Sequence, residues 1–228
     1  MENIFRKITF FSLLFLVLSF SAFSQENIEE QWLTIGAEFG NYFENESSRG
    51  FTYLGSPGFN INLYTFPKEK NIGMFFHFSF LFPAIEKNEK TDFDYLVQYD
   101  MIVGSGFRYN ISEKSKLHFG IGLEFMTPFD IKYKENSTDY YIYNTNLGLG
   151  GDAGLKFDLT ENIYIDVGLS FTYSFINFST LYSFSNDKKI RTTLSDNWTM
   201  KYTMVGIKPY IGIGFNYYRG ETILGKPK

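Results

Sequence analysis

Residues 163–178 carry the clearest alternation of apolar and polar positions in the chain. Ile163, Ile165 and Val167 begin a series of apolar or aromatic residues at every second position, and the residues between them include Asp166 and Ser170. Successive side chains of an extended strand point to opposite faces, so this segment predicts a strand with one apolar and one polar face. It is also much longer than the usual strand of about 5–6 residues.

Seven further segments alternate in a similar way and are predicted to be strands of the same sheet. They cover residues 31–43, 53–66, 72–82, 95–110, 116–128, 140–159 and 198–218. The segment 72–82 is apolar almost throughout, so its two faces are the hardest to tell apart. We predict that its outward residues are Met74, Phe76, Phe78 and Phe80, and that its inward residues are Phe75, His77 and Ser79.

The connections between these segments alternate between short and long. The short ones are residues 67–71, 111–115 and 160–162, and the long ones are residues 44–50, 83–94, 129–139 and 179–197. Short periplasmic turns and longer outer loops are typical of a transmembrane β-barrel, which has lipid outside and a polar lumen inside. Eight strands also close a sheet without free edges, as lipid requires. The pattern therefore predicts an all-β fold, an eight-stranded antiparallel up-and-down transmembrane β-barrel.

Residues 1–24 have the features of a cleaved signal peptide. Arg6 and Lys7 supply positive charge, residues 8–20 are mostly apolar, and the small residues Ala22 and Ser24 precede a predicted cleavage before Gln25. The alternative is an N-terminal membrane anchor, but the apolar run is short for a span of about 20 residues. We therefore predict export through the Sec pathway and a barrel domain over residues 25–228.

The composition excludes several classes of function. The 228 residues include no cysteine, which rules out disulfides, thiolate metal sites, cysteine nucleophiles and an acylated lipoprotein cysteine. The net charge of −4 argues against nucleic-acid binding, which favours basic surfaces. Aromatic residues make up 20% of the chain, and several lie near predicted strand ends, as in the interfacial girdles of membrane proteins. These are Trp32, Tyr42, Tyr95, Tyr140, Tyr141, Trp198, Tyr217 and Tyr218.

With this leader, strand count, alternation and loop asymmetry, the chain resembles the small eight-stranded outer-membrane barrels of the OmpX, OmpA-transmembrane and OmpW type. The resemblance covers nearly all of residues 25–228 and implies the outer membrane of a diderm bacterium. It also implies contact with outer-membrane lipid, with lipopolysaccharide or its equivalent, and with the barrel-assembly machinery. Such barrels often end on an aromatic residue, whereas here Tyr217 and Tyr218 precede the tail 219–228.

Charged residues recur on the polar faces of the predicted strands and form the expected lumen network. They are Glu38, Asp100, Arg108, His118, Glu124, Asp152, Lys156, Asp166 and Lys208, with His77 beside them. A hairpin closed at residues 160–162 sets Lys156 opposite Asp166, and the same geometry sets Arg108 opposite His118. Buried charges are costly unless paired. We favour a structural ion network over an ion path or proton relay, because eight strands leave little open lumen.

His77 and Ser79 raise the possibility of a hydrolase, since some barrels of this type modify lipid A. Residues two apart on a strand are separated by about 6.6 Å, which predicts that these two side chains do not meet directly. We predict instead that His77 bonds Asn60 or Asn62. The sequence therefore assigns no catalytic residue, no metal site and no cofactor, since two histidines without a nearby ligand spacing are no zinc signature.

The predicted loop 179–197 carries the candidate binding residues Lys188, Lys189 and Arg191. They could bind a surface partner or envelope phosphates, and the alternative is an ordinary solvated loop.

Four functions follow for the whole chain. The first is a non-enzymatic outer-membrane barrel that anchors four surface loops for envelope structure or host contacts. The second is a narrow, porin-like channel for small hydrophobic solutes, as the OmpW resemblance implies. The third is a lipid A-modifying enzyme. The fourth, a soluble lipocalin-like barrel, is disfavoured because the apolar outer faces would aggregate in water.

Overall fold

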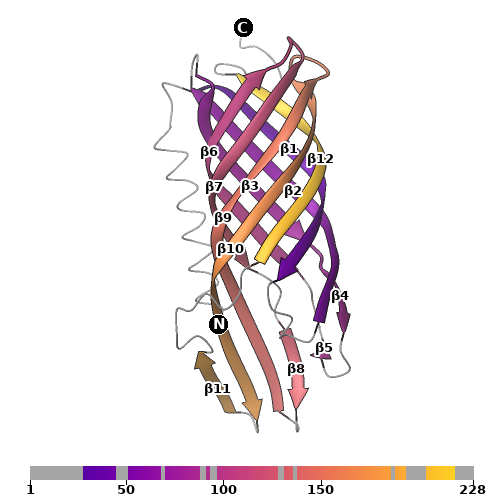
Figure 1. The fold of residues 1–228 in the computed structure, drawn as a ribbon, viewed down its shortest axis with the longest axis vertical. Helices are drawn as coiled ribbons and strands as arrows, with labels where there is room; N and C mark the ends of the chain where they lie inside the picture. Colours follow the sequence, from indigo (N-terminus) through magenta and orange to yellow (C-terminus); the bar gives the residue numbers. More distant parts are fainter. Residues whose placement is uncertain are drawn as a thin grey trace.

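A computed structural model describes residues 28–44, 51–67, 70–87, 91–92, 97–127, 131–135, 138–185, 188–193 and 204–218. Eight long strands in these ranges build the barrel (Figure 1). They are β1 (Ile28–Glu44), β2 (Phe51–Pro67), β3 (Ile72–Leu81), β6 (Gln98–Asn110), β7 (Ser115–Thr127), β9 (Thr138–Asp158), β10 (Ile163–Ser185) and β12 (Met204–Tyr218). No helix among the described residues is long and apolar enough to cross a membrane.

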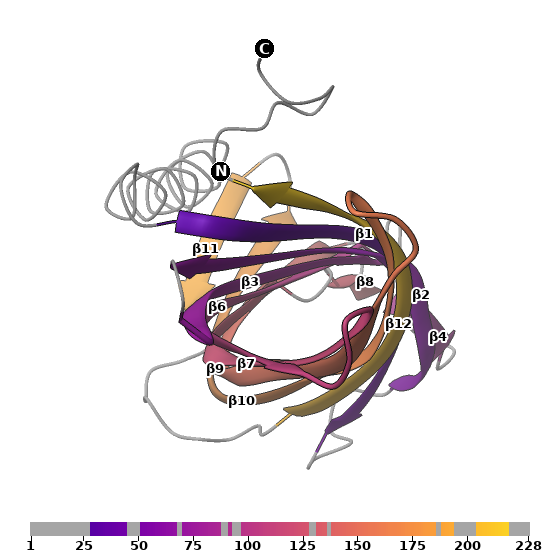
Figure 2. The same ribbon diagram turned by 90° about the horizontal axis from the view of Figure 1, so that it is seen from above.

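The eight strands form a closed antiparallel barrel. Each pairs with its neighbours in chain order, and β1 closes the sheet against β12 through pairs that run from Glu30↔Tyr218 to Glu44↔Met204. The view along the barrel shows this closure (Figure 2). The predicted all-β, eight-stranded antiparallel barrel is therefore confirmed. The predicted leader and its cleavage site lie outside the described residues.

The two ends of the barrel differ, and we name them by their connections. The turn end holds the short connections at residues 111–114 and 159–162. The loop end holds the four long connections, of which 44–50 lies outside the described residues beyond residue 44. The other three, residues 83–94, 129–139 and 179–197, were predicted to be loops but contain further strands. These are β4 (Ala84–Lys87), β5 (Thr91–Asp92), β8 (Ile131–Glu135) and β11 (Lys188–Thr193). The loop prediction was wrong there because these polar segments still complete backbone hydrogen bonds by pairing with neighbouring strands.

The predicted strand 163–178 also proved too short, because β10 continues to Ser185 and stays paired with β9 down to Phe184↔Asp139. The pairing of β10 with β12 stops at Ser174↔Met204. The β9–β10 hairpin therefore runs roughly ten residues past the barrel, about 30 Å at 3.3 Å per residue. With β11, β8 and β5 beside it, this extension makes the protruding sheet, which hangs below the barrel in Figure 1.

Apolar side chains cover the outside of the barrel and polar ones fill the inside. On β7, Leu117, Phe119, Ile121, Leu123 and Phe125 are 38–62% exposed, whereas His118 and Glu124 between them are 1% exposed. On β3, Phe75, His77 and Ser79 are buried, so the inward register predicted for this strand is confirmed. This distribution inverts that of a soluble protein and is the one that lipid requires.

Two apolar clusters lie inside the barrel, one towards each end. The turn-side cluster contains Trp32, Tyr64, Phe66, Phe75, Ile102 and Tyr164. The apolar cluster towards the loop end contains Tyr42, Leu81, Met126 and Met204. Polar residues occupy the interior between and around them, and they make up the candidate site.

Candidate functional site in the barrel interior

Large interior side chains fit because glycines stand opposite them. A methyl group added to Gly120 would lie 2.5 Å from Cγ of Phe75, and one on Gly106 would lie 2.6 Å from Cδ1 of Tyr64. Methyl groups on Gly154, Gly168 and Gly214 would likewise overlap His118, Tyr210 and Tyr164. Small inward residues thus make room for rings in a narrow barrel, and the lumen is packed at these levels.

The substitution Gly120→Ala is expected to destabilise the folded barrel by about 1–3 kcal/mol, because the added methyl group would overlap the buried ring of Phe75 and force it or the backbone to shift. Urea titration in detergent micelles, followed by the faster gel migration of the unheated folded barrel, measures the change. The control is Ala37→Val, at an exposed outward position of β1. Equal stability of the two variants would contradict the packing argument.

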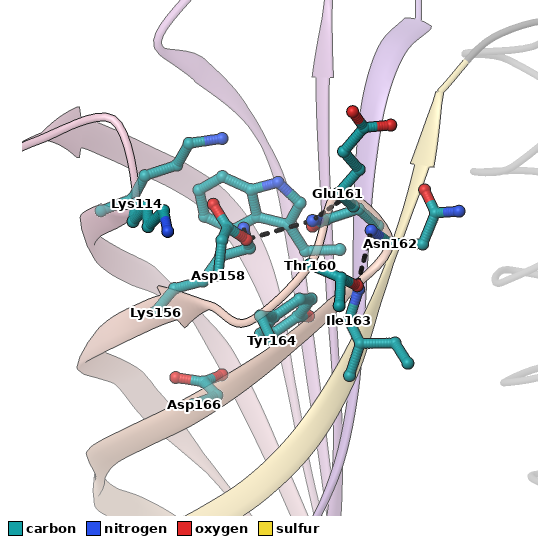
Figure 3. Close-up of polar contacts among 12 residues, drawn as sticks. Lys114, Lys156, Asp158, Thr160, Glu161, Asn162, Ile163, Tyr164 and Asp166 are labelled. Carbon is teal, nitrogen blue, oxygen red and sulfur yellow. Dashed lines mark hydrogen bonds and ion pairs between the residues drawn. The ribbon is translucent and has the colours of Figure 1, made fainter.

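The turn-end cluster consists of Glu30, Arg108, Lys116, Lys156 and Asp158. Glu30 accepts hydrogen bonds from Arg108 and from Lys116, the latter at 2.7 Å between Nζ and Oε1. Lys156 donates to Asp158, and both lie beside the turn at residues 159–162 (Figure 3). The interior at the turn end is therefore closed by interlinked ion pairs.

Aromatic rings support the cations of this cluster. The ammonium of Lys156 lies 4.9 Å from the ring centroid of Trp32 and 4.5 Å from that of Tyr164. Lys116 lies 5.2 Å from the Trp32 centroid, and Arg108 lies 4.6 Å from that of Phe66. Such cation–π contacts stabilise a cation that burial has removed from water.

The predicted backbone pairing of Lys156 with Asp166 is confirmed, but the predicted contact between their side chains is wrong. The two residues are cross-strand neighbours, yet Lys156 bonds Asp158, two residues along its own strand. Arg108 and His118 are likewise opposite each other, yet Arg108 bonds Glu30 across the barrel. Long side chains such as these bond the nearest carboxylate in space. The strand register alone does not determine which carboxylate that is.

The central cluster consists of Tyr64, His118, Asp152, Asp166 and Tyr210, all nearly fully buried. Asp152 accepts hydrogen bonds from Tyr64 and, at 2.9 Å, from Tyr210. His118 Nε2 lies 2.8 Å from Asp166 Oδ1, and its Nδ1 lies 3.2 Å from the Tyr64 hydroxyl. These residues come from five different strands, so the cluster ties together opposite walls of the barrel.

The loop-side cluster consists of Glu38, His77, Ser79, Asp100 and Lys208. Lys208 Nζ donates to Asp100 Oδ2 at 2.5 Å and to Ser79 Oγ at 3.1 Å. His77 Nε2 lies 2.8 Å from Ser79 Oγ and 3.1 Å from Glu38 Oε1. Glu124, nearby on the same side of the barrel, accepts a hydrogen bond from Ser174 Oγ, which lies 2.8 Å from its Oε2 and 3.0 Å from its Oε1.

The predictions for His77 were wrong on both counts. Its side chain meets that of Ser79, because side chains that lean along a strand close the gap between their backbone positions. The expected bonds to Asn60 or Asn62 are replaced by a hydrogen bond between those two amides, 3.2 Å from Nδ2 to Oδ1. His77 instead faces Glu38.

A serine, a histidine and a glutamate therefore meet, but not as a hydrolytic relay. Such a relay uses one ring nitrogen towards the serine and the other towards the carboxylate. Here Nε2 of His77 faces both Ser79 and Glu38, while Nδ1 has no hydrogen-bond partner in the part of the chain that the structure describes. Ser79 is also fully buried and accepts a hydrogen bond from Lys208. This geometry suits a packed polar core.

The nine predicted lumen residues lie in the barrel interior, where eight divide among these three clusters and Glu124 lies beside the loop-side cluster. The predicted network did not include the groups that complete these clusters, namely Glu30, Lys116, Asp158, Tyr64, Tyr164 and Tyr210. Tyr164 and Tyr210 do lie on the faces that the alternation predicts to be inward. Extending the alternation of the first predicted strand by one position would have found Glu30. Among the described residues, no group of three or more histidine or acidic side chains is arranged to hold a metal ion.

The surface candidates Lys188, Lys189 and Arg191 lie in β11, outside the barrel. Their backbone partners in β10 are Ser185, Phe184 and Tyr182. Their strand is an outer strand of the protruding sheet.

A closed barrel with an apolar exterior and a charged interior defines an integral β-barrel membrane protein. The chain belongs to the outer membrane protein beta-barrel domain family, whose model matches residues 10–195. This family places it in the outer membrane of a Gram-negative bacterium. No curated protein matches the chain.

Solved structures share the fold at low sequence identity. The outer membrane protein OprG from Pseudomonas aeruginosa is 10% identical with a TM-score of 0.55, over 85% of this chain and 98% of that one. A major outer membrane protein from Thermus thermophilus is 12% identical with a TM-score of 0.55, over 81% and 99%. The attachment invasion locus protein Ail of Yersinia pestis is 17% identical with a TM-score of 0.48, over 83% and 99%.

Proposed function

We propose that this protein is a non-enzymatic outer-membrane barrel that anchors its loop end, including the protruding sheet, on the cell surface for contacts with the envelope or with a host. The observation that carries this proposal is the contrast between the two parts of the molecule. The barrel interior is packed with rings and paired charges, whereas β9 and β10 continue well beyond it. The elaborated part of the fold is thus outside the lumen.

The alternative, a narrow channel for small hydrophobic solutes, fits the interior less well. A hydrophobic solute would have to displace two apolar clusters and break the ion pairs between them, and unpaired buried charges are costly. We also propose that residues 1–24 direct Sec export and are removed, and that the barrel-assembly machinery inserts the mature chain. Mature protein that begins at Gln25 would support the first of these statements.

Single-cysteine labelling tests the orientation, since the natural chain has no cysteine to interfere. Ser185→Cys is at the end of β10 in the protruding sheet, and Ser112→Cys is exposed at the turn end. A membrane-impermeant maleimide added to intact cells should label the first variant and not the second, and both should react after lysis. Labelling of Ser112→Cys alone in intact cells would overturn the proposed surface role.

Two further measurements separate the alternatives. Planar bilayers that contain the purified protein should show no conductance steps above the leak, and reproducible steps would favour the channel. Lipid A from cells that overproduce the protein should have unchanged mass, and a modified species that disappears in the Ser79→Ala variant would favour the enzyme.

A further inference from the structure

The loop-side cluster lies in a layer of the barrel interior that is covered on both sides. Towards the loop end, the cover is the apolar cluster of Tyr42, Leu81, Met126 and Met204. Each of these residues is two to four positions beyond a polar residue of the layer on its own strand. Towards the turn end, the rings of Phe75 and Tyr210 flank His77, at centroid distances of 6.5 and 6.1 Å. The charged side chains between these covers are at most 3% exposed, so bulk water does not neutralise their charges.

The charged groups of this layer do not balance. Glu38, Asp100 and Glu124 all act electrostatically on Lys208, which is the only lysine of the layer among the described residues. His77 lies 3.1 Å from Glu38 and adds a second positive charge only when it is protonated. Three carboxylates therefore face at most two cations.

The other two interior clusters do not supply the missing charge. The central cluster has two carboxylates, Asp152 and Asp166, and its described residues include one histidine, His118, that contacts both. The turn-end cluster has one cation more than it has acids, which offsets the deficit of the central cluster and no more. A buried carboxylate without a compensating charge is costly. The loop-side cluster and its neighbour Glu124 therefore favour one further cation.

Oxygen atoms without a hydrogen-bond partner among the described residues lie in the same layer. They are Oε2 of Glu38, Oδ1 of Asn60, Oδ1 of Asp100 and Oγ of Ser170, all on buried side chains. A methyl group added to Gly36, the inward neighbour of Glu38 on β1, would lie 2.6 Å from Oδ1 of Asn60. The amide oxygen of Asn60 therefore points into the lumen towards β1.

Strand pairing brings the residues that carry these atoms together. Ser79 is the cross-strand neighbour of both Asn60 and Asp100, and Ser170 is that of Lys208. The ammonium of Lys208 joins the two groups, because it bonds Ser79 and Asp100 across the lumen. Cross-strand neighbours on one face have Cβ atoms about 4.5–5.5 Å apart. The unpartnered oxygens thus come from one small part of the interior around Lys208.

The chemistry of these atoms indicates what they bind. Carboxylate, amide and hydroxyl oxygens are the ligands that hard cations prefer. A divalent ion is disfavoured, because no three acidic or histidine side chains in the described part of the chain are arranged to hold a metal ion. A monovalent cation supplies the one missing charge, and water can complete its coordination shell.

We propose that this layer binds one monovalent cation of the sodium or potassium type through the unpartnered oxygens of Glu38, Asn60, Asp100 and Ser170. The covers at both ends of the layer keep the cation inside the barrel. It therefore stabilises the fold without making the lumen a channel.

The test compares the stability of the full-length protein, refolded in non-ionic detergent micelles, in three chloride salts. Urea titrations are run in sodium, potassium and N-methylglucamine chloride, with the gel migration of unheated samples as the readout. The third cation is too large to enter the layer, and equal ionic strength keeps the screening of surface charges the same.

Three variants accompany the wild type. Glu124→Gln removes one carboxylate of the layer and keeps an oxygen that can accept the hydrogen bond of Ser174. Ser170→Ala removes one ligand oxygen without a change of charge. Glu113→Gln, at an exposed turn-end position, is the control with the same change of charge as Glu124→Gln.

At a given urea concentration, the ratio of folded to unfolded wild type should be about tenfold higher in sodium or potassium than in N-methylglucamine, as for an ion at roughly ten times its dissociation constant. Glu113→Gln should keep this effect in full. Glu124→Gln should lose it, because the charges of the layer then balance. Ser170→Ala should reduce it.

Equal stability of the wild type in all three salts would overturn the inference. A cation effect of the same size in Glu124→Gln and Glu113→Gln would also overturn it, in favour of ions bound at the surface. Stability that ignores the cation and falls as the pH rises would show that a proton on the acids of the layer supplies the charge instead. If Glu124→Gln does not fold, an undiminished cation effect in Ser170→Ala contradicts the inference.

This inference does not rest on the proposed function, since the layer lies inside the barrel whichever end faces the cell surface. The cysteine labelling reports the orientation alone, and the comparison of salts reports the interior alone. Either result can therefore fail without the other.

Discussion

Replacing Lys208 with methionine is expected to destabilise the barrel by about 3–5 kcal/mol, because it leaves a buried carboxylate without its cation. Lys208 is fully buried, and its ammonium bonds Asp100 and Ser79. Asp100 is also fully buried, and its second oxygen, Oδ1, has no hydrogen-bond partner among the described residues. Methionine keeps most of the side-chain volume and removes the charge, so the loss reports electrostatics more than packing.

Urea titration in micelles measures this effect, with the migration of unheated protein as the readout. Lys114→Met, at an exposed turn-end position, is the control and should change stability by less than about 0.5 kcal/mol. The double variant Lys208→Met with Asp100→Asn should recover part of the loss, since it also removes the unpaired carboxylate. Indistinguishable stability of Lys208→Met and Lys114→Met would refute the role of the ion pair.

Replacing Ile121 with arginine is expected to cost about 2–4 kcal/mol in a bilayer, the penalty for a cation on the lipid face near the midplane. Ile121 is 47% exposed and pairs with Gly151, close to the middle of the outward apolar stretch of β9. In water the same substitution at an exposed position would change stability by only about 0.5 kcal/mol or less. The size of the loss therefore reports whether this surface lies in lipid.

Ile111→Arg is a matched control, because Ile111 is 56% exposed but lies in a turn-end connection. Both variants are folded into lipid vesicles, and their free energies of unfolding are compared by urea titration. We expect only the Ile121 variant to lose stability. Equal losses would show that residue 121 is not at the depth that its strand position predicts.

The interior is filled by aromatic rings and paired charges instead of the aliphatic side chains that fill a soluble protein's core. Interior glycines are part of this design, since Gly120 and Gly106 give space to Phe75 and Tyr64. The polar clusters also set the register of opposite walls, because a slip of one residue would turn their charges towards lipid. A barrel that holds itself together in this way can support large extensions at one end.

Some buried polar atoms of the loop-side cluster have no hydrogen-bond partner among the described residues. They are Oε2 of Glu38, Oδ1 of Asp100 and Nδ1 of His77, whereas Oε1 of Glu38 has the ion-pair contact with His77 at 3.1 Å. On the neighbouring strand, Oδ1 of Asn60 and Nδ2 of Asn62 also have no partner among the described residues. Orphaned polar atoms in a buried region are expensive, and water is their usual partner. Loss of Lys208 would add Asp100 Oδ2 to these unpartnered atoms, which is why a large effect is expected at this position.

The sequence alone determined the barrel, its strand number and its inward and outward faces. The alternation of inward and outward side chains can be read from neighbouring residues of one strand. Because lipid on the outside tolerates few polar side chains, the alternation is regular, and it correctly predicted the inward positions of β3. The pairs Lys156–Asp166 and Arg108–His118 were correctly set opposite each other for the same reason. The sequence could not determine which charges bond, because Lys156 reaches Asp158 and Arg108 reaches Glu30 through free rotation of long side chains.

Only the tertiary structure decided what the long connections do. Their polar composition predicts loops, yet residues 131–135 and 188–193 are strands, because β9 and β10 extend past the barrel and offer unpaired edges for backbone hydrogen bonds. The tertiary register then pairs the backbone of Arg191 with that of Tyr182 and the backbone of Lys132 with that of Tyr141. Local alternation is encoded residue by residue, whereas contacts between distant strands depend on how the whole sheet closes.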